Sequence, residues 1–185
     1  MVEKLKAEYN IELEFRPFYL YGDTPPEGRE LPEQVKRARA AGSEERLRQI
    51  ASSHGMKFAA IKRIYNTRLA HEATEYAREH GKAGEFNRVV FRKVYAEGQD
   101  ISQWAVLHSA ALEAGLDADE MQSEVQGGKF TAEVAAQVRQ AYQIGVSGVP
   151  TYVINNRYAI VGAQPYEVFK NALAKILKSR DASSK

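Results

Sequence analysis

The sequence predicts an α/β fold in which a long helical segment separates the strands of one sheet. Residues 11–15 alternate apolar and charged side chains, which is the period of a half-buried strand. Residues 32–145 divide into helix-length stretches bounded by polar caps and glycines. After Gly145, two short β-prone runs precede an amphipathic C-terminal helix. Strands at both ends with helices between them indicate a sheet covered by helices.

The N-terminal part is expected to be a helix followed by a strand. The first nine residues place Val2 and Leu5 on one side of a helix. The strand Ile11–Phe15 follows, and Pro17 ends it because proline has no N–H to donate to a ladder. Residues 21–32 are rich in turn residues and predict a loop.

The central block, residues 32–145, is expected to form a bundle of about five or six helices. Pro32 suits the first position of a helix, where a missing N–H costs nothing. The expected N-caps are Ser43, Asn66 or Thr67, Asp117 with Glu120 as a capping box, and Thr131. The expected helix ends are Gly55, Gly81, Gly98, Gly115 and Gly145.

The C-terminal part is expected to form a hairpin and a final helix. The runs PTYVIN and RYAIVG are separated by Asn155 and Asn156, which tolerate positive φ in a tight turn. Pro165 lies in the first turn of the following helix. The expected buried stripe of this helix is Val168, Leu173, Ile176 and Leu177.

Composition excludes several classes of function. The 185 residues suit one domain with an insertion, and a net charge of +2 lacks the basic surplus of a nucleic-acid-binding protein. No stretch approaches the roughly 20 apolar residues that span a bilayer, and the N-terminus lacks the apolar core of a signal peptide. We therefore expect a cytoplasmic protein with no nucleic-acid or membrane partner. The absence of cysteine excludes thiolate chemistry, and the four histidines lack metal-binding spacing, so neither metal nor cofactor is expected.

Five segments together resemble the DsbA-like thioredoxin superfamily, and within it the FrnE-type branch. They are EFRPFYL, PPEG, YNTRLAHEATEYAREHG, DISQWAVLHSAALEAGLD and GVSGVPTYVINNRYAIVGAQPYEVFKNAL, in this order. The resemblance implies a partial thioredoxin-like (DsbA-like) core formed by residues 1–31 and 146–185. Residues 32–145 would be a large helical insertion, and the Val149–Pro150 peptide bond would be cis.

The chain departs from this family at its start. Family members begin with a strand that ends in a Cys-x-x-Cys motif, whereas this chain begins inside the helix that follows. The missing first central strand would lie between Ile11–Phe15 and the strand from Thr151, so both would lose ladder partners, at about 1–3 kcal/mol for each buried unpaired group. Either a partner chain fills the gap, the sheet rearranges, the fold is marginal, or the natural product is longer, which is the explanation we favour.

The resemblance implies two groups of site residues. Val149, Pro150 and Thr151 would bind substrate, because the backbone of the residue before the proline can pair with an extended peptide or with glutathione. The alternative is that Pro150 only shapes a turn. Asn66, Thr67, His71 and Trp104 would belong to an active-site face. The alternatives are that Asn66 or Thr67 caps a helix, that His71 is a packed or solvated histidine and that Trp104 belongs to the core.

The sequence is compatible with three functions. The first is a protein thiol–disulfide oxidoreductase lineage whose chain, as it stands, is redox-inactive because no residue can supply the thiolate. The second is a redox-dead module that binds an extended peptide or protein, or forms a homodimer or larger assembly through the vacant strand position. The third is a glutathione-dependent isomerase or transferase related to the kappa class.

Overall fold

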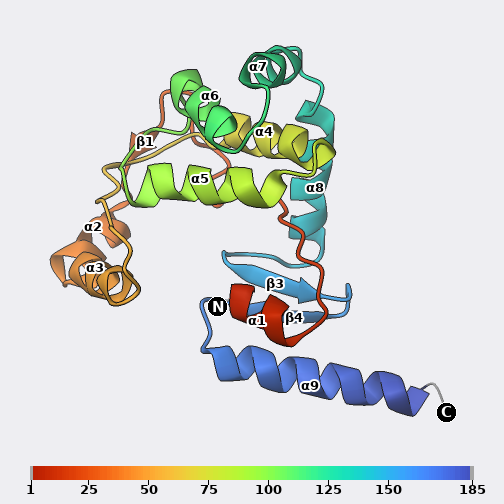
Figure 1. The fold of residues 1–185 in the computed structure, drawn as a ribbon. Coiled ribbons are helices and arrows are strands. Elements are labelled where there is room, and N and C mark those ends of the chain that lie inside the picture. The colour runs from red at the N-terminus through yellow and green to blue at the C-terminus, as the bar shows by residue number, and fades with distance from the viewer. Residues whose placement is uncertain (1, 184–185) are drawn as a thin grey trace. The chain divides into compact units, whose positions relative to one another are not determined.

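Helices form most of this computed structural model, which describes residues 2–183 (Figure 1). The chain divides into two units, Met1–Leu20 with Gln140–Lys185 and Tyr21–Arg139, and each is described by itself. Across the described residues, every helix is too short or too polar to traverse a bilayer.

The first unit is built on a β-hairpin. Its elements are α1 (Val2–Glu8), β3 (Thr151–Ile154), β4 (Tyr158–Val161) and α9 (Tyr166–Ser183). β3 and β4 pair antiparallel, with Thr151 opposite Val161 and Ile154 opposite Tyr158. Asn155 and Asn156 have φ values of 52° and 53°, which confirms the predicted asparagine turn.

One face of this hairpin packs against α1 and α9. Ile160 of β4 forms a buried cluster with Leu5 of α1 and with Phe169 and Leu173 of α9. The ring of Tyr152 meets Phe169 edge-on, with centroids 4.8 Å apart. Figure 1 shows α9 running along the hairpin, with α1 beside it.

The predicted stripe of α9 is half right. Leu173 and Ile176 are buried, but Val168 and Leu177 are 40% and 46% exposed. Phe169 is buried in their place, because positions 169, 173 and 176 follow the i, i+4, i+7 spacing of one helix face.

The strand predicted at Ile11–Phe15 does not form. These residues belong to neither of the ladders found in the described chain. Ile11 and Leu13 are half-buried and Glu12 is exposed, but Phe15 is exposed too, so the alternation in burial covers only part of the predicted strand. A strand also needs a neighbouring strand for its backbone groups, and within residues 2–183 nothing pairs with this segment.

The second unit is mainly helical. Its elements are β1 (Arg29–Glu30), α2 (Glu33–Ala40), α3 (Ser43–Ser53), β2 (Arg63–Ile64), α4 (Arg68–Glu79), α5 (Ala83–Tyr95), α6 (Trp104–Glu113), α7 (Ala118–Gln126) and most of α8 (Thr131–Gln143). The described block thus holds seven helices rather than the five or six expected. The β1–β2 ladder was not predicted, since strands of two residues have no detectable period.

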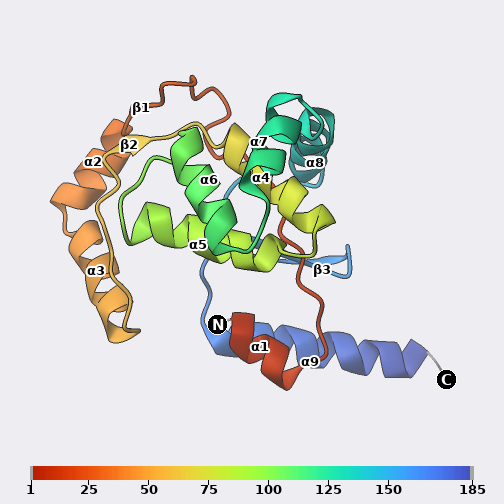
Figure 2. The same ribbon diagram turned by 45° about the horizontal axis from the view of Figure 1, so that its top comes forward.

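The core of the second unit lies among α4, α5, α6 and α7 (Figure 2). Its largest fully buried side chains include Tyr76, Phe86, Leu107 and Met121. Tyr76 donates a hydrogen bond to Glu120 at 2.5 Å, and burial together with this carboxylate raises the pKa of the phenol. The hydroxyl therefore stays protonated at neutral pH and keeps its acceptor.

The predicted helix boundaries are partly confirmed. Asp117 accepts hydrogen bonds from the backbone of Asp119 and Glu120, as a cap should, whereas the Glu120 carboxylate accepts from Tyr76 and does not complete the predicted capping box. The predicted capping roles of Ser43 and Thr131 are wrong, because each is the first helical residue. The Thr131 hydroxyl instead donates to buried Glu72 at 3.1 Å.

Pro32 also differs by one position, being the N-cap of α2 rather than its first residue. The helix ends are better predicted. The glycines expected at them all have positive φ, namely Gly55, Gly81, Gly98, Gly115 and Gly145.

Candidate functional site

The segment Val149-Pro150-Thr151 forms a turn that leads from α8 into β3. The peptide bond between Val149 and Pro150 is cis. Two hydrogen bonds hold the turn: the Thr151 hydroxyl donates to the Gly148 carbonyl at 2.7 Å, and the Gly162 N–H donates to the Pro150 carbonyl at 2.8 Å. The turn is thereby tied both to the preceding loop and to the end of β4.

Val149, like Pro150, is an exposed residue of this turn. Its side chain is 53% exposed, and within the described chain no hydrogen bond involves its N–H or C=O. The strand that follows has a similar opening. β3 pairs only with β4 among the described strands, so the alternate backbone groups on its other edge have no ladder partner there.

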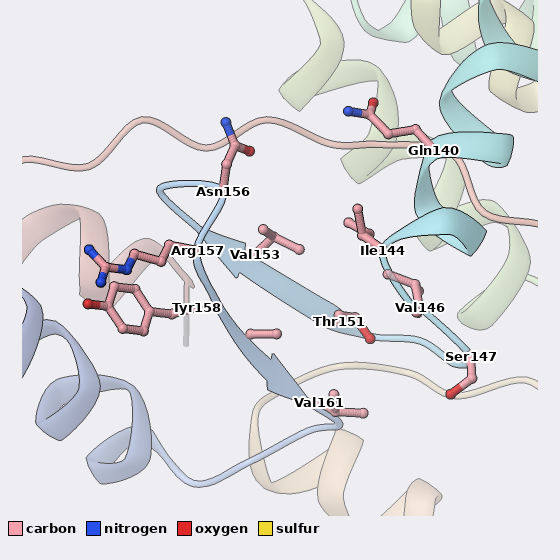
Figure 3. A pocket seen from close by; sticks show the side chains of 12 residues that line it. Gln140, Ile144, Val146, Ser147, Thr151, Val153, Asn156, Arg157, Tyr158 and Val161 are labelled. Atoms are coloured by element: carbon pink, nitrogen blue, oxygen red, sulfur yellow. The ribbon is translucent and has the colours of Figure 1, made fainter.

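A cavity of about 260 Å³ lies on the face of the hairpin opposite α9 (Figure 3). Thr151 and Val153 of β3 and Val161 of β4 contribute one wall. Ile144, which follows α8, and Val146 of the next loop contribute the other. Val153 and Val161 are 43% and 59% exposed, so this apolar face of the hairpin is open to a ligand.

Polar groups stand at the mouth of this cavity. Figure 3 shows the Gln140 amide pointing from α8 toward the hairpin turn, where the Asn156 amide stands away from the strands. Arg157 is the one charged residue among the described lining residues, and its guanidinium lies 5.6 Å from the centre of the Tyr158 ring. In Figure 3 the Arg157 side chain extends along Tyr158.

The cavity is equipped for binding rather than for covalent chemistry. Ser147 supplies its exposed hydroxyl, but no histidine, aspartate or glutamate accompanies it among the described lining residues. A serine without an adjacent base is a weak nucleophile. Burial raises the pKa of the Tyr152 phenol on the other face of β3, so this phenol also stays protonated at neutral pH. In residues 2–183, no cluster of three or more potential metal ligands exists.

The predicted residues Asn66 and Thr67 lie in the second unit, at the start of α4. The side-chain oxygen of Asn66 accepts a hydrogen bond from the Arg68 N–H at 2.9 Å. The side-chain NH₂ of Asn66 donates to the Thr24 backbone carbonyl at 2.8 Å. Thr67 occupies the N-cap position but makes no capping hydrogen bond with its side chain. The geometry thus gives Asn66 a local structural task, closing the start of α4 onto the preceding loop.

The other two predicted residues of this group, His71 and Trp104, lie on different helices. His71 is half-buried in the first turn of α4. Trp104, at the start of α6, is half-buried and packs against the core of the second unit. Its indole nitrogen is buried without a hydrogen-bond partner among the described residues. Asn66, Thr67 and His71 therefore share one end of α4, whereas Trp104 belongs to another helix of the same unit.

The residues lining the cavity were not predicted, apart from Thr151. One signal was available in the sequence. The strand TYVI carries bulky or β-branched side chains on both of its faces, as strands buried on both sides do. The second apolar face, with Val153, is the one that the cavity exposes.

Comparison with known proteins identifies relatives along nearly the whole chain. The uncharacterized protein YwbO of Bacillus subtilis strain 168 is 26% identical over 175 residues, which are 93% of this chain and 85% of YwbO. A probable DsbA oxidoreductase from Streptomyces coelicolor superposes with a TM-score of 0.78 and 26% identity, over 86% of this chain and 73% of its own.

A third relative shares the fold alone. A 2-hydroxychromene-2-carboxylate isomerase superposes with a TM-score of 0.77 at 17% identity, over 100% of this chain and 90% of its own. The sequence model of the DSBA-like thioredoxin domain matches residues 1–174. The chain therefore belongs to the DSBA-like thioredoxin domain family, and its fold is of the thioredoxin-like α/β class.

Proposed function

We propose that this chain is a DsbA-like module that binds extended polypeptides without performing thiol–disulfide exchange itself. The bound segment lies along Val149 and the outer edge of β3 and adds a strand to the hairpin. Membership of the DsbA-like family and the similarity to a probable DsbA oxidoreductase support an oxidoreductase lineage. Exchange requires a thiolate, and the chain contains no cysteine.

The observation that carries this proposal is the open backbone of Val149 and β3. An extended peptide satisfies such groups by main-chain hydrogen bonds, which give affinity, while adjacent pockets select side chains. The Val149 side chain and the apolar wall of the cavity lie beside this edge and offer such contacts.

Fluorescence anisotropy with a labelled peptide tests the proposal. A paired strand points only alternate N–H groups toward its neighbour. We therefore expect N-methylation of alternate peptide residues to weaken binding at least tenfold, and methylation of the intervening residues to have little effect. Equal tolerance of methylation at every position would show that no strand is added.

A pair of variants locates the binding edge. Val149→Glu adds a charge that a bound peptide must desolvate, so affinity should fall. Val168→Glu is the matched control, because Val168 is a similarly exposed valine of α9 in the same unit. Dithiothreitol should leave peptide binding unchanged, because the chain has no cysteine to form a disulfide with the peptide. If the two variants bind alike, the peptide lies elsewhere.

The same edge can also pair with a second copy of the chain, and we propose that peptide and homodimer compete for it. Light scattering should then show that the peptide lowers the mean mass of the protein.

We further propose the FrnE-type branch, based on the GVSGVP and GAQP segments. Titration with glutathione tests the kappa-class alternative, because that alternative requires binding and an absence of binding would remove it.

A further inference from the structure

Beyond strand addition, we propose that the cavity beside β3 selects one side chain of the bound polypeptide and that this side chain is aliphatic. The inference rests on the proposed function for the placement of the peptide. It adds the substrate class: an extended segment with an aliphatic residue at one fixed register position.

The register of the bound peptide decides which of its side chains face the cavity. In antiparallel pairing, the side chain opposite a given strand residue projects from the same face, with Cβ atoms about 4.5–5.5 Å apart. A peptide residue opposite Val153 would therefore project on the face that carries the cavity, because Val153 lines it. Its two neighbours in the peptide would project on the other face, where Tyr152 packs against Phe169.

The size and polarity of the cavity favour an aliphatic side chain. A volume of about 260 Å³ lies just below the range of roughly 300–1,000 Å³ of small-molecule pockets, so it suits one side chain rather than a drug-sized ligand. Ile144, Val146, Val153 and Val161 supply apolar walls. No acidic residue is among the described lining residues, and the one cation, Arg157, lies 5.6 Å from the centre of the Tyr158 ring. An aliphatic side chain fits this environment, whereas a buried Lys would leave its charge without an opposite partner.

Two side-chain amides at the mouth of the cavity can contact the peptide backbone. The amides of Gln140 and Asn156 each offer two donors and an acceptor, the chemistry that complements a peptide group. Asn156 lines the cavity, but its neighbour Asn155 does not. We therefore assign the Asn156 amide a contact with the backbone beside the selected side chain.

The test uses a host peptide with a guest residue at the position opposite Val153. We expect Leu to bind about tenfold more tightly than Ala, and Lys to bind more weakly than Ala because no described lining residue is acidic. Val153→Asp should abolish the preference for Leu, and Val168→Asp should retain it. If the peptides bind with the methylation pattern of an added strand but show no guest preference, this inference fails and the proposed function stands.

A second measurement does not depend on strand pairing. N-acetyl-leucine methylamide should shift the methyl NMR signals of Ile144, Val153 and Val161, and the alanine analogue should not. Asn156→Gly keeps the positive φ of the turn but removes the amide, so it should weaken this binding, whereas Asn155→Gly should not. Equal shifts with the leucine and alanine compounds would overturn the inference. Equal effects of Asn156→Gly and Asn155→Gly would overturn the assignment of the Asn156 amide.

Discussion

Lys93 provides a quantitative test of the second unit. This lysine of α5 is 4% exposed, and its ammonium lies 2.6 Å from the Glu113 carboxylate of α6. It also donates to the Ser109 hydroxyl at 3.1 Å. A buried ammonium is stable only if its charge is compensated, so Glu113→Gln should destabilise the protein.

The size of the expected loss follows from how deeply Lys93 and Glu113 are each buried. Removing one partner of a fully buried ion pair costs about 3–5 kcal/mol. The Glu113 side chain is 40% exposed, so water screens part of this interaction, and the Ser109 hydroxyl remains in the variant. We therefore expect a loss of about 1–3 kcal/mol in the free energy of unfolding. For a chain of this size, about 2 kcal/mol lowers Tm by roughly 4–8 °C.

Glu97→Gln is the matched control. Glu97 pairs with the exposed Arg92 at the surface, where the loss of an ion pair costs at most about 1 kcal/mol. Urea unfolding followed by circular dichroism measures both variants. If Glu113→Gln is no more destabilising than Glu97→Gln at pH 7, compensation of the buried ammonium is not what stabilises this contact.

Acidification gives an independent check. Lys93 and Arg92 lower the pKa of Glu113 below its ordinary value of 4.5. The contribution of the carboxylate is therefore complete above pH 4.5 and is lost as the pH falls through the lowered pKa of the folded protein. The difference in the free energy of unfolding between the parent protein and Glu113→Gln should therefore disappear over that pH range. A constant gap would contradict the electrostatic reasoning.

Two further substitutions test other parts of the fold. Phe169→Ala empties a 3% exposed site in the core of the first unit, so urea unfolding should show a loss of about 3–5 kcal/mol. Gly28→Ala should also destabilise, by about 1–3 kcal/mol, because Gly28 has a φ of +75° and a Cβ there would lie 2.6 Å from the Ile64 carbonyl oxygen. Its control is Gly84→Ala in α5, where a Cβ would meet open space. This substitution should raise the free energy of unfolding by up to about 1 kcal/mol, because alanine favours the helix more than glycine does. Destabilisation by Gly84→Ala, or none by Gly28→Ala, would contradict this account.

The sequence was most informative where structure is local. Asp117 caps α7 through groups two and three residues away, and Asn155 with Asn156 turns the hairpin by their own φ preference. Such features depend on neighbours along the chain, so the pattern of residues predicts them. Ser43 and Thr131 show the limit, because a residue with a capping side chain can equally begin a helix and use its hydroxyl elsewhere.

Features that depend on distant partners were less predictable. Ile11–Phe15 has the alternation of a strand, yet alternation indicates only which side chains share a face. Whether a ladder forms depends on a neighbouring strand, and the described chain provides none for these residues. The burial of Lys93 is similar, since its partner Glu113 lies on another helix and no period marks it.

The candidate site combines both kinds of information. The proline turn was visible in the sequence because Val149 and Pro150 are consecutive, but the cavity was not, since α8, the following loop and the hairpin all contribute to it. The two apolar faces of β3 connect these observations. One face is covered by Phe169, and the other is left to the cavity with Val153 43% exposed. A strand with apolar side chains on both faces gains most when both are covered, so the open face and the open edge of β3 favour the same occupant: an extended segment that pairs with the strand and fills the cavity.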